Sequence, residues 1–535
     1  MVAALLLLAV AVRIPVMLRN PLPAGDGITS HVEMAVNLIR GNGFSTMRKW
    51  NIHDDSMAPL RPEGNRQPIM AMLLAPIFMV TGPSFPPAQV LALFLGILCL
   101  SACWFWTRRL FGTGPALFTL LVLSVTPMFV WYSVQPDSLL LFTFFFFVAL
   151  VLADVRRLSP GRAALLGLVS GLAYLSRTQG LLLIFSMGAW ILFSAGKKRF
   201  SRFAVFSAVF LLVCAPWFIR NLSAFGSPIY TQGSQFLLNE NHWSAWEVRE
   251  EPPGPMDLLR YRGPASVLRF VAAGILRVME PFTTGSLHRG EVFGQPSLVG
   301  FALLALLLVR NSEIRKRLLP AAFAAIPPMA MLALHEHSNR YLAFLVVLVT
   351  ALGSGGLLRF AGSTSNRTAV AAAALLLAPF VYPMGKVLVY DTRAKAAEAA
   401  EVSSWISVNT DPDDWVVTFP TVEMMIWDYR RPTLTMPNDY EALLWPCLQK
   451  HGVRYVVIDE WLPRLRPHLA RRWRRSATGD DWQVISPPPF LEEVYRSGSE
   501  RTLVYEMTGE VPRDFMSVDS LPRDNLRALP PTPGR

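Results

Sequence analysis

The chain has 535 residues, of which 52% are hydrophobic and 16% charged, and its formal net charge is +12. This composition, with a mean hydropathy of +0.35, is too apolar for a soluble protein of this length and predicts a polytopic membrane protein. The basic residues fall in short clusters between apolar runs rather than along one soluble face, which argues against nucleic acid as a partner.

Runs of about 20 apolar residues, the length that crosses a bilayer, recur along the chain. We predict eleven transmembrane helices, near residues 2–18, 88–106, 115–133, 137–154, 162–176, 179–195, 202–219, 292–309, 318–334, 341–358 and 368–385. The first has no basic start and no small-residue cleavage site, which favours a retained helix over a signal peptide. The phenylalanine run 144–147 is expected to face lipid.

Lysines and arginines occur in alternate connections between these spans. They are Arg108, Arg109, Arg156, Arg157, Arg162, Lys197, Lys198, Arg199, Arg202, Arg310, Arg315, Lys316, Arg317, Arg359 and Arg367. By the positive-inside rule this side faces the cytoplasm, so we expect a cytoplasmic N-terminus in the cytoplasmic (inner) membrane. The outer side then receives a first loop at 19–87 and a long loop at 220–291.

Two apolar stretches in the outer loops are poor spans. The stretch 69–80 is too short, and the stretch 266–282 is interrupted by Arg269, Arg277 and Glu280. We expect both to be helices in the outer interface, which leaves residues 1–385 as the transmembrane domain.

After residue 386 the composition changes, with more charge, more tryptophan and short strand-like runs. The segments 415–419 and 454–459 are typical of buried strands, and 440–451 has a helical pattern. We predict a small extracytoplasmic α/β domain over 386–510. The Pro- and Arg-rich tail 511–535 lacks the apolar content to pack and is expected to be disordered.

Ionisable residues gather at the outer ends of the predicted spans and in the outer loops. They are Asp26, Glu33, Asp137, Arg177, Arg220, His335, Glu336, His337 and Arg340. Such groups at one interface, away from the basic clusters that set topology, indicate a functional site. Each one alone has another interpretation, as a helix cap or as a side chain that snorkels towards lipid head groups. Together, acids with arginines and histidines suit a reaction that moves a group off a phosphate.

Asp26 is the leading candidate for a catalytic base. It lies between Gly25 and Gly27, just beyond the first apolar run, where a lipid head group and a water-soluble acceptor both have access. The alternative is that Asp26 caps a helix beginning near Ser30. Glu33, on that helix, is the next candidate, as a secondary acid or an acceptor contact.

Four stretches, in chain order, carry a family resemblance. They are 25–44, with Gly25-Asp26-Gly27 and Glu33; 167–183, with Ser176-Arg177; 216–226, with Pro216-Trp217-Phe218-Ile219-Arg220-Asn221; and Arg340-Tyr341-Leu342. As an ordered set they resemble the GT-C glycosyltransferases, in the bacterial branch related to protein O-mannosyltransferases and lipid A aminoarabinose transferases. The first loop departs from the family pattern, because many relatives carry two adjacent acids where Asp26 is followed by Gly27.

The resemblance implies a polytopic α-helical GT-C fold and an enzyme that transfers a sugar from a polyprenyl phosphate donor at the outer membrane face, with inversion. Asp26 matches the first-loop catalytic acid of the family and Asp137 matches the second-loop acid. The acceptor stays open between an envelope lipid, a glycan and a protein.

Inverting transfer needs a base for the acceptor proton and cations for the leaving phosphate. Arginine suits phosphate because its planar fork donates two hydrogen bonds, so Arg220 and Arg340 are the first choices, with His335 and His337 next. The His335-Glu336-His337 triplet with Asp137 is also a candidate for holding a divalent metal, Mg²⁺ or Mn²⁺, although alternate residues in a short turn diverge.

A transporter or flippase for a lipid-linked sugar is the competing interpretation. Such a protein is expected to place ionisable residues near mid-membrane and to contain inverted repeats. The sequence shows neither feature, which favours the enzyme.

Overall fold

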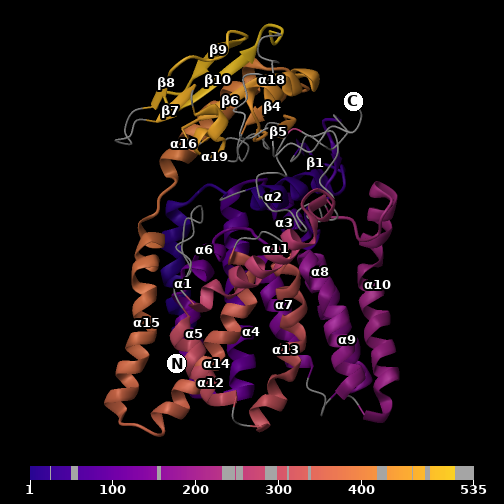
Figure 1. Ribbon diagram of the computed structural model, residues 1–535, viewed down its shortest axis with the longest axis vertical. Helices are drawn as coiled ribbons and strands as arrows, with labels where there is room; N and C mark the ends of the chain where they lie inside the picture. Colours follow the sequence, from indigo (N-terminus) through magenta and orange to yellow (C-terminus); the bar gives the residue numbers. More distant parts are fainter. Residues whose placement is uncertain are drawn as a thin grey trace.

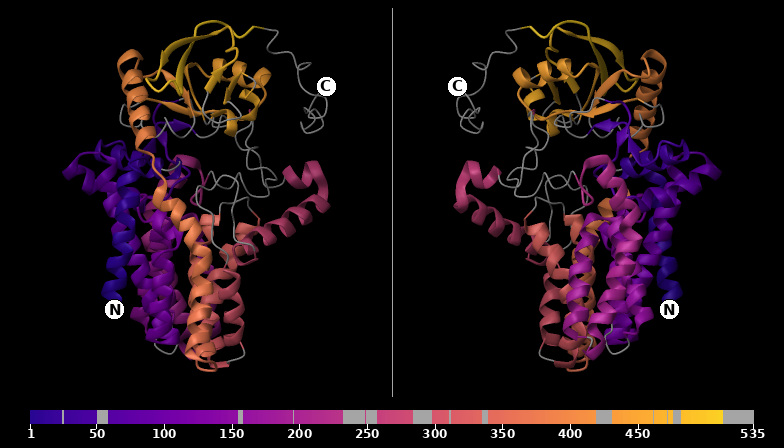
Figure 2. Two further views of the ribbon diagram at one scale, coloured as in Figure 1. Left: turned by 90° about the vertical axis from the view of Figure 1, so that its left-hand side faces the viewer. Right: turned by 90° about the vertical axis from the view of Figure 1, so that its right-hand side faces the viewer.

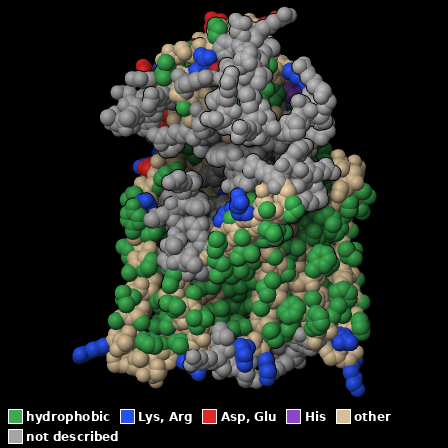
Figure 3. All heavy atoms as spheres, viewed as in Figure 1, with side chains coloured by type: hydrophobic (Ala, Val, Ile, Leu, Met, Phe, Trp, Pro, Cys, Tyr) green, Lys and Arg blue, Asp and Glu red, His purple; other side chains and the backbone are tan. Residues whose placement is uncertain are grey.

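A helical bundle carries a small α/β domain at one end, and the N-terminus lies at the other end of the bundle (Figures 1 and 2). The computed structural model describes residues 1–23, 26–49, 58–153, 158–194, 196–231, 248, 257–283, 298–309, 312–334, 339–418, 431–460, 462–470, 472–475 and 482–512. In Figure 3, hydrophobic side chains cover the flank of the bundle, and lysine and arginine side chains project at the end away from the α/β domain.

In the described residues, each of the eleven predicted spans coincides with helical structure; residues 292–297 of the span 292–309 lie outside the described part of the chain. The helices of the bundle are α1 (Val2–Arg19), α4 (Phe85–Phe111), α5 (Thr113–Ser124), α6 (Pro127–Tyr132), α7 (Leu139–Leu152), α8 (Pro160–Ser176), α9 (Leu182–Ser194), α10 (Arg199–Phe225), α12 (Val299–Val309), α13 (Ser312–Ala333), α14 (Ala343–Ala361) and α15 (Asn366–Val389). Within the described ranges, five helical stretches are long and apolar enough to cross a membrane: Val2–Arg19, Phe85–Phe111, Gly196–Phe225, Arg340–Ala361 and Asn366–Asn409.

Several predicted spans are divided in the structure. The span 115–133 becomes α5 and α6, because Pro127 begins a new helix. The span 179–195 begins with a 3₁₀ turn, η2 (Thr178–Leu181), and the span 341–358 follows a similar turn, η6 (Asn339–Leu342). These interruptions leave short irregular segments at helix ends, where polar side chains can converge.

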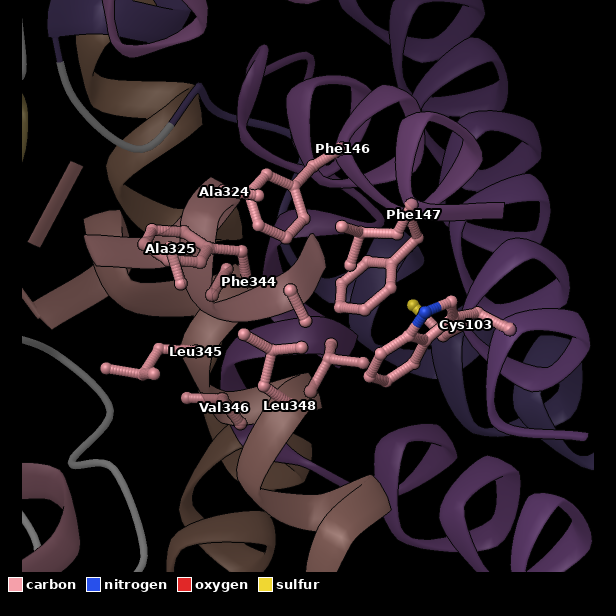
Figure 4. Close-up of a cluster of buried hydrophobic side chains, with 14 of the residues drawn as sticks. Cys103, Phe146, Phe147, Ala324, Ala325, Phe344, Leu345, Val346 and Leu348 are labelled. Atoms are coloured by element: carbon pink, nitrogen blue, oxygen red, sulfur yellow. The ribbon is translucent and has the colours of Figure 1, made fainter. Parts of the chain in front are cut away.

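The expectation that the phenylalanine run 144–147 faces lipid is wrong for two of its rings. Phe146 and Phe147 are fully buried in the core of the bundle (Figure 4). Phe147 packs edge-on against Trp106, with 5.1 Å between ring centroids. The ring centroids of Phe146 and Phe344 are 5.0 Å apart. A helix that is apolar on every side does not reveal from sequence which face is buried.

Three helices lie at the end of the bundle that faces the α/β domain: α2 (Asp26–Ile39), α3 (Ile69–Thr81) and α11 (Asp257–Thr283), which kinks at Gly263 (Figures 1 and 2). Helices α2 and α3 pack against α10 through a shared apolar cluster that includes Val32, Met70 and Trp217. This layer joins the first loop to the membrane helices.

The α/β domain is built on a six-stranded sheet in the order β2-β5-β4-β6-β10-β9. Its strands are β2 (Arg48–Lys49), β4 (Trp415–Thr418), β5 (Thr433–Thr435), β6 (Val453–Asp459), β9 (Leu491–Arg496) and β10 (Thr502–Met507). The pairs from β2 to β6 are parallel, and β10 is antiparallel to both of its neighbours.

Helices cover both faces of this sheet. Helix α16 (Arg393–Asn409) packs Val402 and Ile406 on one face, and α18 (Glu441–Lys450) packs Leu444 and Trp445 on the other. Smaller elements complete the fold: α19 (Leu462–Leu465), η3 (Gly196–Lys198), η8 (Pro467–Leu469), a β1 (Ser45–Thr46) and β3 (Arg61–Pro62) pair, and a β7 (Trp473–Arg475) and β8 (Trp482–Val484) pair. The predicted strands at 415–419 and 454–459 and the helix at 440–451 are confirmed.

The edge strand β2 comes from the first loop, not from the C-terminal region. Arg48 and Lys49 pair in parallel with Thr433 and Leu434 of β5, and the Thr433 amide donates to the Met47 carbonyl at 3.1 Å. The first loop and the C-terminal domain therefore share one sheet. Of the predicted tail 511–535, only residues 511 and 512 are within the described part of the chain.

Candidate active site

Asp137 anchors a buried polar cluster at the domain-facing end of the bundle. It lies between α6 and α7, and its Oδ1 accepts a hydrogen bond from the Leu139 amide at 2.7 Å, which holds the first turn of α7. The same oxygen accepts from the Arg177 guanidinium at 3.0 Å. Asp137 is 8% exposed, so this ion pair is largely shielded from water.

Arg177 and Arg340 flank one aromatic ring. The Arg177 guanidinium lies 4.8 Å from the ring centroid of Tyr341, and that of Arg340 lies 5.2 Å from it. Terminal nitrogens of Arg340 lie 3.5 Å from the Tyr132 hydroxyl and 3.4 Å from the Tyr341 hydroxyl. The breaks before α7, η2 and α14 thus bring together residues from distant parts of the chain.

His31 on α2 reaches the same cluster. Burial lowers the pKa of His31 to about 3; the neighbouring Arg66 and Arg177 lower it too, while Asp137 acts in the opposite direction. The imidazole is therefore neutral at physiological pH. Its side chain is 3% exposed, and its Nδ1 has no hydrogen-bond partner among the described residues.

Glu33 connects α2 to the strands of the first loop. Its Oε2 accepts from the Thr46 hydroxyl at 2.8 Å, and its Oε1 accepts from the Met47 amide. Burial raises the pKa of Glu33, against the opposing effect of these hydrogen bonds and of Arg48. Both carboxylate oxygens thus accept hydrogen bonds, from the two residues that directly precede β2.

Asp26 is the first residue of α2, so the helix begins earlier than the expected start near Ser30. The Asp26 side chain lies outside what the structure describes. Its role as base, or as the cap of α2, stays a prediction.

Arg220 belongs to a different cluster from Arg340. One terminal nitrogen donates to the Glu63 carbonyl at 2.7 Å and to the Asn221 amide oxygen at 2.9 Å, and the other donates to the Phe44 carbonyl at 2.7 Å. Its guanidinium also lies 4.7 Å from the Trp217 ring centroid. Within the described chain, Arg220 holds the first loop against α10 and does not contact Asp137 or Arg340.

The structure does not describe residues 335–338, so the proposed roles of His335, Glu336 and His337 stay predictions. Within the described ranges, no group of three His, Cys, Asp or Glu side chains is placed to hold a metal ion. Asp137 Oδ1 is occupied by two N–H donors, one of them from Arg177, which does not fit a metal ligand at that oxygen.

Sequence reasoning placed Arg177 among the outer ionisable residues, but it missed four members of the cluster: His31, Arg66, Tyr132 and Tyr341. The available signal was position: Tyr341 is adjacent to Arg340, and Arg66 closes the polar segment just before α3. Tyr132 lies at the end of a short helix that no pattern distinguished from its neighbours.

Comparison with known proteins addresses the fold directly. Residues 65–219 match the family model described as dolichyl-phosphate-mannose-protein mannosyltransferase. ArnT from Cupriavidus metallidurans in the apo state has 14% identity and a TM-score of 0.56 to this chain, over 95% of this chain and 99% of that one. The fold is that of the GT-C glycosyltransferases.

Two further solved structures have the same fold. ArnT bound to undecaprenyl phosphate has 14% identity and a TM-score of 0.55, over 95% of this chain and 99% of that one. The archaeal oligosaccharyltransferase AglB from Archaeoglobus fulgidus, in complex with an inhibitory peptide and a dolichol-phosphate, has 14% identity and a TM-score of 0.56, over 91% of this chain and 74% of that one. No curated protein matches the chain.

The predicted resemblance to GT-C enzymes is confirmed by the family match and by the fold. The predicted α-helical fold with a small C-terminal α/β domain is confirmed as well. The family match covers less than a third of the chain, and these structural neighbours share 14% of its sequence.

Proposed function

We propose that this protein transfers a sugar from a polyprenyl phosphate to an envelope lipid, glycan or protein acceptor at the outer face of the cytoplasmic membrane. The observation that carries the proposal is the buried convergence of Asp137, Arg177 and Arg340 at the domain-facing end of the bundle. In two proteins of the same fold, the described complexes contain undecaprenyl phosphate or dolichol-phosphate.

The arginines supply what a leaving phosphate requires. Asp137 fixes Arg177, and both guanidinium groups lie close to the Tyr341 ring, 4.8 Å and 5.2 Å from its centroid. With Arg66 as a third positive neighbour of Tyr341, the described cluster carries more positive than negative charge. A phosphate bound there receives charge-assisted, bidentate hydrogen bonds.

Asp26 acts as the base in this proposal, and Asp137 positions Arg177. The Asp26 carboxylate takes the proton of the acceptor hydroxyl, the acceptor oxygen bonds to the anomeric carbon, and the bond from that carbon to the phosphate oxygen breaks. Polyprenyl phosphate leaves, and the anomeric configuration inverts. Neutral His31 offers a hydrogen bond to a sugar hydroxyl through Nδ1.

The orientation is part of the proposal: the N-terminus is cytoplasmic and the α/β domain is outside. A membrane-impermeant thiol reagent tests it in intact cells carrying Cys447→Ser with either Ser363→Cys or Ser499→Cys, both at exposed positions. Cys447 itself is a poor reporter, because burial raises the pKa of its thiol to about 11. Labelling at 499 but not at 363 is expected, and the reverse pattern contradicts the orientation.

The decisive assay is transfer from a synthetic polyprenyl phosphosugar by the purified full chain, read by mass spectrometry of the product. Cells with and without the protein, compared by mass spectrometry of envelope lipids and glycans, identify the acceptor. A requirement for Mg²⁺ or Mn²⁺ is tested in the same assay with a chelator. Movement of the donor across proteoliposomes without any product indicates the flippase instead.

A further inference from the structure

A polar pocket, separate from the Asp137 cluster, lies between the first loop and the end of α10. Its volume is about 410 Å³, and its polar lining includes Ser45, Arg61, Arg220 and Ser223. The antiparallel pairing of Ser45 with Pro62 and of Thr46 with Arg61 holds the first-loop side of this pocket together. A pocket of this size can hold a substituted phosphate head group.

Two arginines, Arg61 and Arg220, line the pocket, and the Glu63 carboxylate lies close enough to Arg220 to interact with its charge. Arg220 donates to two backbone carbonyls and a side-chain amide, which are all neutral groups, so its charge is not cancelled by a direct ion pair with any described carboxylate. Arg61 adds a second guanidinium and is 7% exposed. Ser45 is 5% exposed, and its hydroxyl is a buried donor with no hydrogen-bond partner among the described residues, which a phosphate oxygen that reached it would satisfy.

The pocket adjoins an exposed apolar stretch of α10. On α10, Leu212, Ile219 and Leu222 are 74%, 67% and 54% exposed, as expected of a surface that faces lipid tails. Ser223 and Ala224, which follow directly, line the pocket. The apolar surface of α10 and the arginine-lined pocket thus lie next to each other, as in a site that binds a lipid head group and its chains.

We propose that this pocket binds the phosphate head group of an anionic lipid, at a site separate from the Asp137 cluster. Arg61 and Arg220 attract the phosphate, Ser45 donates to it, and the acyl or prenyl chains run down the exposed leucine and isoleucine face of α10. The phosphate chemistry fits either a bulk phospholipid or a lipid-linked acceptor. The inference does not depend on the identity of the sugar donor.

The test is native mass spectrometry of lipids retained by the full chain. The protein is taken from nanodiscs of phosphatidylcholine with either phosphatidylglycerol or undecaprenyl phosphate. Ala224→Trp fills the pocket from an exposed position. Val370→Trp, at an exposed position of α15 away from the pocket and from α10, is the matched control. Thermal unfolding confirms that both variants fold.

We expect the parent and Val370→Trp to retain an anionic lipid, and Ala224→Trp to reduce its retention by about tenfold or more. Arg61→Gln is expected to weaken retention as well. The lipid lost on Ala224→Trp identifies the source: phosphatidylglycerol indicates a bulk phospholipid, and undecaprenyl phosphate indicates a lipid-linked ligand. Equal retention by Ala224→Trp and the parent overturns the site. Unchanged retention by Arg61→Gln overturns the recognition of phosphate.

Discussion

Arg177 and Arg220 both lie at the domain-facing ends of bundle helices, but different groups hold their guanidiniums. Arg177 is bonded to the Asp137 carboxylate and lies against the Tyr341 ring that Arg340 also contacts. Arg220 is bonded to the backbone carbonyls of Phe44 and Glu63. One arginine is oriented by a carboxylate beside a second cation, and the other fastens a loop to a helix.

This difference predicts a substrate-binding role for Arg177 and a structural role for Arg220. An arginine fixed by an acid, with further arginines nearby, is prepared for a phosphate that arrives with a substrate. An arginine whose donors bind backbone carbonyls has already used them to shape the first loop, although it keeps its charge. Substitutions at the Asp137 cluster should therefore change transfer, and substitutions at Arg220 should first change stability.

The largest expected effect on transfer is at Asp26, because its proposed role is that of the catalytic base. Asp26→Asn keeps the side-chain shape but removes the proton acceptor, so kcat for transfer should fall by ~10²-fold or more at unchanged expression. Asp391→Asn, in an exposed ion pair with Arg393, is the control. Turnover near that of the parent would reduce Asp26 to a structural residue of α2.

Arg340 is expected to show a two-step loss of transfer. Arg340→Lys keeps the charge but loses the bidentate fork, and Arg340→Ala loses both, with each charge-assisted hydrogen bond worth about 1.5–3 kcal/mol. Arg359→Lys, an exposed arginine that donates to the Leu307 carbonyl, is the control. Full activity of the lysine variant would indicate that Arg340 only snorkels towards head groups.

For Arg220 the expected loss is in stability. Arg220→Lys cannot bond the Phe44 and Glu63 carbonyls in the same geometry, so we expect it to destabilise the protein by about 1.5 kcal/mol. The checks are Tm in detergent and the KM for the donor, which should not change. An unchanged Tm with a raised donor KM would indicate that Arg220 binds the donor and is not mainly structural.

The smallest effect concerns His31 and pH. Because the pKa of folded His31 is about 3, well below the ordinary value, the unfolded chain binds more protons below pH ~6.5, and stability falls as pH decreases. At pH 5.5 this loss amounts to about 1.4 kcal/mol for one histidine. Thermal unfolding at pH 7.5 and 5.5 should show it for the parent and not for His31→Gln. Identical pH dependence would contradict a buried, neutral His31.

Much of the fold could be predicted from the sequence, because membrane-length apolar runs and basic connections are strong local signals. The burial of Phe146 and Phe147 could not, since a phenylalanine suits lipid and protein core equally well. Strand β2 could not either: Arg48 and Lys49 show no strand pattern, and their partner β5 lies far along the chain.

The candidate site was only partly predictable, for a similar reason. Asp137, Arg220 and Arg340 are recognisable as outer polar residues from their places at helix ends. Which of them meet depends on how the helices pack, and that packing brings Arg177, not Arg220, to the Asp137 cluster. Contacts of this kind join residues from separate helices, so no local spacing encodes them.

The affinity for undecaprenyl phosphate tests the central claim most directly. The dissociation constant should be measured for the parent, Arg340→Ala and Arg220→Lys, each also carrying Ala224→Trp so that the α10 pocket is filled. We predict that Arg340→Ala weakens binding by about 10- to 100-fold, while Arg220→Lys leaves it unchanged. Equal affinity in the parent and Arg340→Ala, or an equal loss in Arg220→Lys, would contradict the assignment of the lipid phosphate to the Asp137 cluster.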